Sequence, residues 1–549
     1  MRAAILLLLS LPLLLVAQKG APKTESFMIA GRVCDAETDV GLAGAEVAIA
    51  PVAHRNQLAS VFTNNQGLFS FRGLQKGKYV LQSARQGFAA ESYQEHLGYS
   101  TAIAVGPGLD SAHITFPLRK PGTIFGTITD QDGDPVPNAE VYVFEQQVRD
   151  GLRGTWMVSE VGTNNDGSYR LNKLRSGSYF IAVVARPWYA RNAEQLGPQT
   201  VTADDQMLDV AYPVTFYPEG RSASEAAPIK IQSGSKAEAD VVLASMPAAR
   251  VRLRVPSGAR IVRAYFELAS DWASEVHQGT GWWGDGGQVH SVAPGTYRMV
   301  ALWDDATGRH STRRMVSVSG DVTLDLPSDE ELVVAANLKR DGKAEVSSPP
   351  LALRNVRTGV LVRARPAENG RVEWRGGDLS PERYEMVTSS EGDTYIKSIG
   401  VSGARVSGRT LDLPGSGKVE MNVTLATGLA MFRGAVKQEE KAVGGAMVLL
   451  LPDDLASNTA LARRDQSDSD GTFLLRNVVP GNYTLLALPP GSEDVEYLRP
   501  QVIAPYLANG RRVAIQPNGR YQALASLSLN DKTMREQPPS AGTHSRAAP

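Results

Sequence analysis

The stretch Asp166-Gly-Ser-Tyr-Arg-Leu-Asn-Lys-Leu-Arg-Ser-Gly-Ser-Tyr179 decides the fold of this chain. A turn glycine, Gly167, opens a short run in which apolar and polar residues alternate, and Gly177 opens a second such run. Alternation with a period of two predicts half-buried β-strands. We interpret the unit as a β-hairpin, because Asp-Gly favours the type I′ turn, in which both central residues have positive φ.

The same unit recurs about five times along the chain. In its three clearest copies the turn glycine precedes the tyrosine by 12 positions, in the pairs Gly67 and Tyr79, Gly167 and Tyr179, and Gly471 and Tyr483. Two weaker copies carry Gly286 with Tyr297 and Gly370 with Tyr384, and Pro381 stands where the other copies have the second glycine. Such repetition predicts a row of small β-domains. Each tyrosine is expected to bury its ring in the core and leave its hydroxyl near the surface.

The repeats divide the chain into five predicted modules, each a two-sheet sandwich because its strands alternate and its turns are close. The predicted segments are a signal peptide at 1–18, modules at 27–119, 120–247, 248–326, 327–427 and 428–530, and a disordered tail at 531–549. Module 2 carries an insertion around Trp188 to Arg221, module 3 is degenerate and tryptophan-rich, and module 4 is degenerate.

The repeated pattern resembles the carboxypeptidase regulatory-like domain, over a little more than half of the chain. In the second copy the matching positions are Gly126, Ile128, Ala139, Val141, Val143, Asp166, Gly167, Tyr169, Leu171, Gly177 and Tyr179. The resemblance implies an all-β chain, a tandem array of about five antiparallel seven-stranded sandwiches of immunoglobulin-like or prealbumin-like type. That type belongs to a wider carbohydrate-binding-like fold group, and tandem copies are familiar in secreted bacterial proteins. In metallocarboxypeptidases the domain follows a catalytic domain, and since this sequence has none, peptidase activity is not implied.

The charge balance and the first residues limit where the protein is expected to be located and which partners it is expected to bind. Lysine and arginine total 57 against 58 aspartates and glutamates, so the sequence lacks the basic surplus of a nucleic-acid binder. Arg2 precedes an apolar run from Ala3 to Val16, which is too short to span a bilayer and predicts a cleaved signal peptide rather than an anchor. We therefore expect an exported protein, periplasmic, cell-surface or extracellular, with no membrane span in the mature chain. Cys34 is the single cysteine, so no intramolecular disulfide forms.

The sequence contains no convincing catalytic motif. It has no His-Glu-x-x-His and no Gly-x-Ser-x-Gly, so we predict neither an enzyme nor a bound cofactor or metal. Two acidic turns leave one alternative open, a loose calcium site in place of a solvated turn. These turns contain Asp130, Asp132 and Asp134, and Asp465, Asp468 and Asp470.

An aromatic cluster supplies the candidate binding site. Four of the seven tryptophans fall within 32 positions of module 3, namely Trp272, Trp282, Trp283 and Trp303. Indole faces pack against the C–H groups of sugars, so we predict that these four bind carbohydrate, with hydrogen bonds from Asp271, Glu275, His277 and Asp285. The alternatives are that they fill a core or dock a protein.

The resulting hypothesis is an exported, non-enzymatic, multidomain binding protein that holds carbohydrate on its β-sandwich surfaces. The alternative is a structural or protein-interaction rod, or an accessory subunit of an exported enzyme or transporter. The predicted partners are accordingly a polysaccharide or an envelope protein, and not a nucleic acid.

Overall fold

The computed structural model describes residues 26–190, 209–270, 272–274, 276–278, 280–282, 287–306, 308–326, 332–341, 351–374, 378–388 and 392–527. The predicted signal peptide and tail lie outside these residues. Strands dominate the described part of the chain, and α2 (Pro500–Leu507) is the single α-helix there. None of the helices in the described ranges is long and apolar enough to cross a bilayer. The predicted all-β class is confirmed.

Five sandwiches follow one another, each around a hydrophobic core of its own. Module 1 contains β1 (Phe27–Asp35), β2 (Glu46–Pro51), β3 (Ala59–Phe62), β4 (Leu68–Leu74), β5 (Gly77–Ala84), β6 (Glu91–Ser92), β7 (Ile103–Val105) and β8 (Ile114–Leu118). Module 2 contains β9 (Gly122–Asp130), β10 (Glu140–Arg149), β11 (Leu152–Gly162), β12 (Ser168–Leu174), β13 (Gly177–Val184), β14 (Val210–Ala211), β15 (Thr215–Phe216), β16 (Ile229–Ile231), β17 (Lys236–Glu238) and β18 (Val241–Leu243). A short strand, β19 (Met246–Pro247), pairs with β14 where module 2 meets module 3.

The remaining three modules are built from similar numbers of strands. Module 3 contains β20 (Ala249–Arg254), β21 (Arg260–Leu268), β22 (His277–Gln278), β23 (Thr280–Trp282), β24 (Gln288–Val292), β25 (Gly295–Asp305), β26 (Gly308–Val318) and β27 (Val322–Asp325). Module 4 contains β28 (Leu332–Arg340), β29 (Leu351–Asn355), β30 (Leu361–Arg363), β31 (Arg365–Pro366), β32 (Arg371–Trp374), β33 (Arg383–Thr388), β34 (Thr394–Ser402), β35 (Arg405–Ser407), β36 (Thr410–Asp412) and β37 (Gly417–Thr427). Module 5 contains β38 (Ala430–Gln438), β39 (Lys441–Ala442), β40 (Met447–Pro452), β41 (Arg463–Gln466), β42 (Thr472–Val478), β43 (Gly481–Leu488), α2, β44 (Arg511–Ile515) and β45 (Arg520–Ser526).

All five modules share one core strand order, to which modules 3 and 4 add further edge strands. In module 1 the sheet β4-β1-β8 faces the sheet containing β3-β2-β5, and in module 5 the strands β42, β38 and β45 face β41-β40-β43-β44. The predicted antiparallel sandwich is confirmed. The first strand of each module also pairs in parallel with a late strand, such as β1 with β8, and in module 2 with two, β17 and β18. Each of the five main hydrophobic clusters is accordingly drawn from a single module.

The repeated unit is a crossover between sheets, and the predicted hairpin is wrong. β12 pairs with β9, whereas the next strand, β13, pairs with β10 in the facing sheet. A strand buries every second residue in either arrangement, so alternation does not tell a hairpin from a crossover. The type I′ turn is also wrong, because Gly167 has φ +73° but Asp166 is not among the residues with positive φ.

The repeated tyrosines are core residues, as predicted. Tyr179 is buried, and its hydroxyl donates a hydrogen bond of 2.9 Å to the carbonyl oxygen of Arg175, four residues earlier. The same bond is made by Tyr79, Tyr297 and Tyr483. Each hydroxyl is therefore tied to the crossover that precedes its strand, which fixes the path of the chain between the two sheets.

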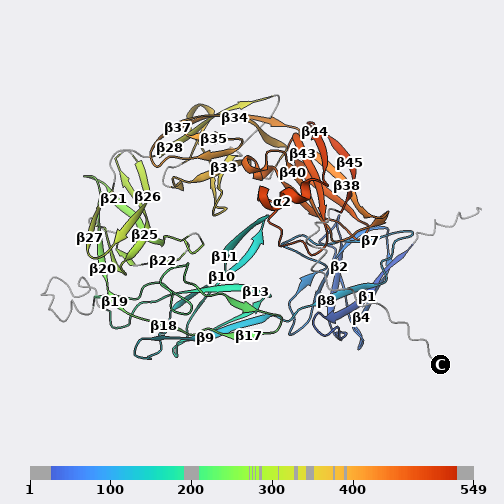
Figure 1. The fold of residues 1–549 in the computed structure, drawn as a ribbon, viewed down its shortest axis with the longest axis horizontal. Helices are drawn as coiled ribbons and strands as arrows, with labels where there is room; N and C mark the ends of the chain where they lie inside the picture. Colours follow the sequence, from blue (N-terminus) through green and yellow to red (C-terminus); the bar gives the residue numbers. More distant parts are fainter. Residues whose placement is uncertain are drawn as a thin grey trace, which may run out of the picture.

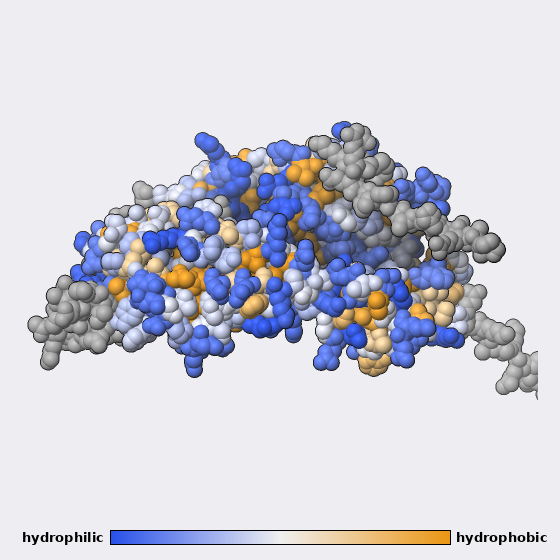
Figure 2. Space-filling model, turned by 60° about the horizontal axis from the view of Figure 1, so that its bottom comes forward, coloured by the Kyte–Doolittle hydropathy of each residue, from blue (hydrophilic) through white to orange (hydrophobic). Residues whose placement is uncertain are grey.

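The modules are arranged in a ring, in which module 1 lies beside module 5 (Figure 1). The antiparallel pair β10–β11 of module 2 projects inward toward α2 of module 5 (Figure 1). The face seen in Figure 2 is mainly hydrophilic, with apolar residues in small scattered groups. An extended rod is therefore the wrong description of this array, because its first and last modules meet.

Candidate functional site: a groove between the first and last modules

The ring is closed by hydrogen bonds between residues almost 400 positions apart. Lys78 on β5 contacts both Asp468 and Thr472 of module 5 through its ammonium group. The side-chain amide of Gln466 donates to the hydroxyl of Thr101 at 2.9 Å, and both side chains are buried. Since a buried polar group without a partner costs free energy, these bonds favour the closed arrangement over a separated one.

The inward-projecting pair β10–β11 adds a second contact with module 5. Leu152, at its tip, packs against an apolar cluster formed by β40, β43 and α2. Beside it, Leu498 donates its backbone N–H to the carbonyl of Gly151 at 3.1 Å, and the Arg153 Nε lies 3.2 Å from an oxygen of Glu496. Module 5 is therefore held by module 1 and by module 2 as well as by module 4.

A groove of about 1060 Å³ lies where module 1 meets module 5. Its floor is the outer face of β42, β38 and β45, whose ladders place two rows of side chains across the three strands. These rows are Thr472, Ala435 and Leu524, and Leu474, Arg433 and Gln522. Val52, Lys78, Val80 and Ser100 of module 1 line the other wall. The floor thus combines aliphatic groups with hydrogen-bonding side chains.

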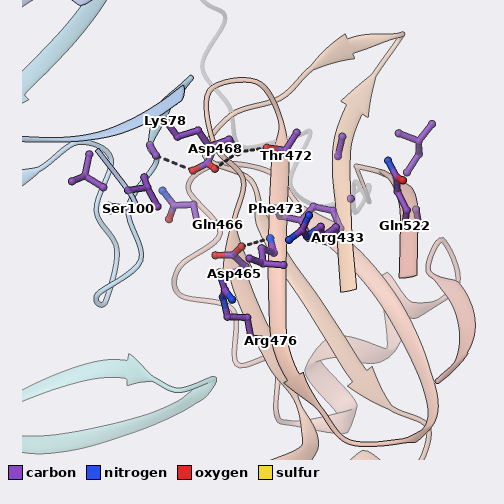
Figure 3. A pocket seen from close by; sticks show the side chains of 18 of the residues that line it. Lys78, Ser100, Arg433, Asp465, Gln466, Asp468, Thr472, Phe473, Arg476 and Gln522 are labelled. Atoms are coloured by element: carbon purple, nitrogen blue, oxygen red, sulfur yellow. Dashed lines mark hydrogen bonds and ion pairs between the residues drawn. The ribbon is translucent and has the colours of Figure 1, made fainter. Parts of the chain in front are cut away.

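Four arginines in this groove have no carboxylate partner in the described part of the chain. They are Arg55, Arg433, Arg476 and Arg511, and among the described residues none makes an ion pair or a side-chain hydrogen bond. Arg433 and Arg476 rise from β38 and β42, on the same face as Gln522 (Figure 3). Their guanidinium groups are exposed and free to bind a ligand.

Two carboxylates of the groove serve the protein itself. Both oxygens of Asp468 are engaged. One contacts Lys78 (Figure 3), and the other accepts the backbone N–H of Ala102 at 3.0 Å. Burial raises the pKa of Asp468, although the ion pair with Lys78 acts in the opposite direction. Asp465 accepts the backbone N–H of Leu474 at 2.7 Å, and burial raises its pKa too. Both groups therefore act as acceptors that hold the closure and the floor.

Of the four predicted tryptophans, Trp272 and Trp303 have side chains that the structure describes, and these two belong to different hydrophobic clusters. Trp303 is 3% exposed in the core of module 3 and stacks on His310. Trp272 is half-buried at the junction with module 2, where its ring meets three phenylalanines. Neither indole offers an open face to a sugar, so the prediction of a four-tryptophan platform does not hold for these two. Trp282 lies on β23, and Trp283 lies outside the described residues.

Of the predicted hydrogen-bonding neighbours of that platform, His277 is the one that lies within the described residues. His277 lies on β22, its ring 4.7 Å from that of Tyr265, and burial lowers the pKa of its imidazole. Asp271, Glu275 and Asp285 lie outside the described residues. The acidic turns have local roles, since Asp130 accepts the backbone N–H groups of Asp132 and Asp134 at 3.0 and 2.9 Å. Across the described ranges no three metal-binding side chains converge.

Sequence reasoning missed the groove, although a local signal exists. Leu524 and Leu474 alternate with core residues on their strands and therefore face outward. Outward-facing leucines on neighbouring strands indicate a covered or ligand-binding face. What the sequence does not contain is any indication that module 1 packs over this face.

Two stretches of the chain, residues 28–118 and 123–211, match the carboxypeptidase regulatory-like domain, and together they make up about a third of its length. The resemblance noted in the sequence is confirmed for modules 1 and 2. No curated protein matches the sequence.

Several solved structures are distantly similar. The Bacillus anthracis TIE protein is 10% identical, with 92% of this chain and 76% of that one covered and a TM-score of 0.17. A streptococcal ancillary pilin is 10% identical, with 56% and 100% covered and a TM-score of 0.19. The shaft pilin SpaA from Lactobacillus rhamnosus GG is 11% identical, with 41% and 98% covered and a TM-score of 0.19. At these scores none of the three bears on function.

Proposed function

We propose that this chain, whose first two modules are carboxypeptidase regulatory-like domains, is an exported, non-enzymatic binding protein that holds carbohydrate in the groove between modules 1 and 5. The observation that carries the proposal is the groove itself. At about 1060 Å³ it lies at the upper end of the usual range for small-molecule sites, which suits a short stretch of polysaccharide.

The composition of the groove fits a sugar. Pyranose rings have apolar C–H faces bordered by hydroxyl groups, and the floor alternates Ala435 and Leu524 with Gln522 and Thr472. The apolar side chains pack against the ring, and the amide and hydroxyl groups replace the hydrogen bonds that the sugar loses to water. The same alternation along two rows accommodates consecutive sugar units.

The site supports binding without hydrolysis. A glycoside hydrolase uses two carboxyl groups, one as acid and one as nucleophile or base, on either side of the scissile bond. Asp468 has both oxygens engaged in closing the ring, and Asp465 supports the backbone of β42. Neither histidine nor cysteine is found among the residues that line the groove.

The test is retention of the full mature chain on a panel of immobilised neutral and acidic polysaccharides. Ala435→Phe places a ring in the middle of the floor and is expected to reduce retention at least tenfold. Ala514→Phe, on the opposite sheet of module 5 and exposed, is the matched control and is expected to bind like the wild type. Retention of no polysaccharide, or equal retention by both variants, contradicts the proposal.

A second candidate function, binding of an envelope protein, is favoured by one edge of module 1. β3 is an edge strand, its last residue Phe62 is 70% exposed, and Leu58, which precedes the strand, is 63% exposed. Edge strands with exposed apolar side chains pair readily with another chain. Phe62→Ser is then expected to reduce capture of an envelope protein without altering polysaccharide retention.

A further inference from the structure

We infer that the ligand of this groove is a polyanionic polysaccharide, whose carboxylate or sulfate groups bind Arg433, Arg476, Arg55 and Arg511. The inference rests on the proposed function and specifies its ligand class. Its basis is a local charge surplus in a chain that is otherwise balanced. Five basic side chains line the groove against two carboxylates, whereas the formal net charge of the whole chain is −1.

The whole surplus of positive charge lies on the four arginines, because the fifth basic side chain, Lys78, is paired with a carboxylate. Asp468 is paired with Lys78, so this aspartate and this lysine neutralise one another within the closure. Asp465 accepts a hydrogen bond from the backbone of β42. The four arginines face one remaining carboxylate, which leaves a surplus of three positive charges. A guanidinium group binds carboxylate or sulfate oxygens through paired N–H donors.

The positions of the arginines also suit a chain-like ligand. Arg433 lies between Leu474 and Gln522 in one row across the sheet, with neighbouring strands about 4.8 Å apart. Arg476 follows two positions after Leu474 on β42, so the two guanidinium groups rise from the same face at neighbouring positions. Arg55 and Arg511 approach from module 1 and from β44. Charges spread along an apolar floor match a polymer that carries an acidic group on each repeating unit.

An acidic polypeptide is a poorer fit than a polysaccharide. Peptides that add to sheets use backbone hydrogen bonds at an open edge. Here the floor is centred on β38, which is paired on one side with β42 and on the other with β45, so its backbone groups are already bonded. Recognition must then come from side chains on the face of the sheet, and this favours a ligand with acidic groups and apolar ring faces.

The experiment measures binding of the full mature chain to polygalacturonate, to neutral dextran and to poly-L-glutamate by isothermal titration calorimetry. Polygalacturonate is expected to bind, and its affinity is expected to fall as the salt concentration rises. The double variant Arg433→Gln and Arg476→Gln is expected to lower this affinity about 100-fold, about tenfold for each arginine. The matched control is Arg72→Gln, since Arg72 is an exposed arginine of module 1 that forms no ion pair with the described residues, and it is expected to change the affinity less than twofold.

Each other outcome contradicts a defined part of the argument. Dextran binding that matches polygalacturonate binding and survives the double variant overturns the inference and leaves the proposed function standing. Binding of no polysaccharide overturns both. Poly-L-glutamate binding as tight as polygalacturonate binding overturns the assignment to a polysaccharide. Should the double variant unfold, the salt dependence of wild-type binding decides, since an affinity independent of salt contradicts the inference.

Discussion

Trp272→Ala is expected to loosen the junction between modules 2 and 3, because Trp272 is a packing residue there. Its ring lies 4.9 Å from that of Phe144, 5.4 Å from Phe180 and 5.5 Å from Phe216, measured between centroids. Replacing a fully buried tryptophan by alanine lowers the free energy of unfolding by about 3–5 kcal/mol, and each aromatic pair contributes about 0.5–1.5 kcal/mol beyond its buried area. For this half-buried side chain we expect the free energy of unfolding to fall by ~3 kcal/mol.

The assay is thermal unfolding of the full chain, followed by calorimetry. If modules 2 and 3 unfold together as a unit of about 200 residues, ~3 kcal/mol lowers the midpoint of their transition by roughly 6–12 °C. Trp188→Ala is the matched control, because Trp188 is 82% exposed and its loss is expected to shift the midpoint by no more than about 2 °C.

The two variants also separate a packing role from a sugar-binding role. Trp272→Ala is expected to retain polysaccharide as the wild type does at temperatures below its transition. A packing role for Trp272 is refuted if Trp272→Ala melts like Trp188→Ala and also loses polysaccharide retention. That result would identify the indole as part of a sugar-binding site.

Four further variants test the modules and their junctions. Gly67→Ala is expected to destabilise module 1 by more than about 1 kcal/mol, because its φ is +78° and the new Cβ would lie 2.4 Å from a backbone carbonyl oxygen. The control Gly73→Ala has a similar φ, +75°, but open space around the new Cβ, so it is expected to cost only about 1 kcal/mol. Equal denaturant midpoints for the two variants would contradict this expectation. Glu385→Ala is expected to lower the free energy of unfolding by about 3–5 kcal/mol in denaturant titrations, because it leaves Arg354, at the junction of modules 4 and 5, without its carboxylate partner. A decrease of less than about 1 kcal/mol would contradict this expectation. The Lys120 ammonium beside Asp35 holds the pKa of that carboxyl below its usual range, so the pair stabilises the fold above about pH 4 and loses its effect as the pH falls through the folded pKa. Lys120→Met should therefore lower the melting temperature at pH 7 and leave it nearly unchanged near pH 2, and a shift of equal size at both pH values would contradict the assignment.

The strands and the buried residues of each module can be predicted from the sequence, because they depend on local patterns. The burial of Tyr79, Tyr179 and Tyr483 follows from alternation within a single strand, and so does the all-β class. The path of the chain between sheets does not follow, because strand pairing is set by contacts that are distant in sequence. β12 and β13 are neighbours along the chain and still belong to different sheets.

The candidate site shows the same limit more strongly. Trp272 and Trp303 are close in sequence, yet one packs against module 2 and the other lies in the core of module 3. The groove depends on Lys78 meeting Asp468, a pairing that no local pattern encodes. A binding site assembled from the first and last modules becomes visible only when the path of the whole chain is known.

Closure of the ring also makes the assembly tolerant of damage. In a linear array, one proteolytic nick in a connector separates the chain into two fragments. Here module 5 keeps its contacts with modules 1, 2 and 4, so a single cleavage leaves both fragments bound to each other through the surviving interfaces. At least two cuts are needed before a fragment diffuses away.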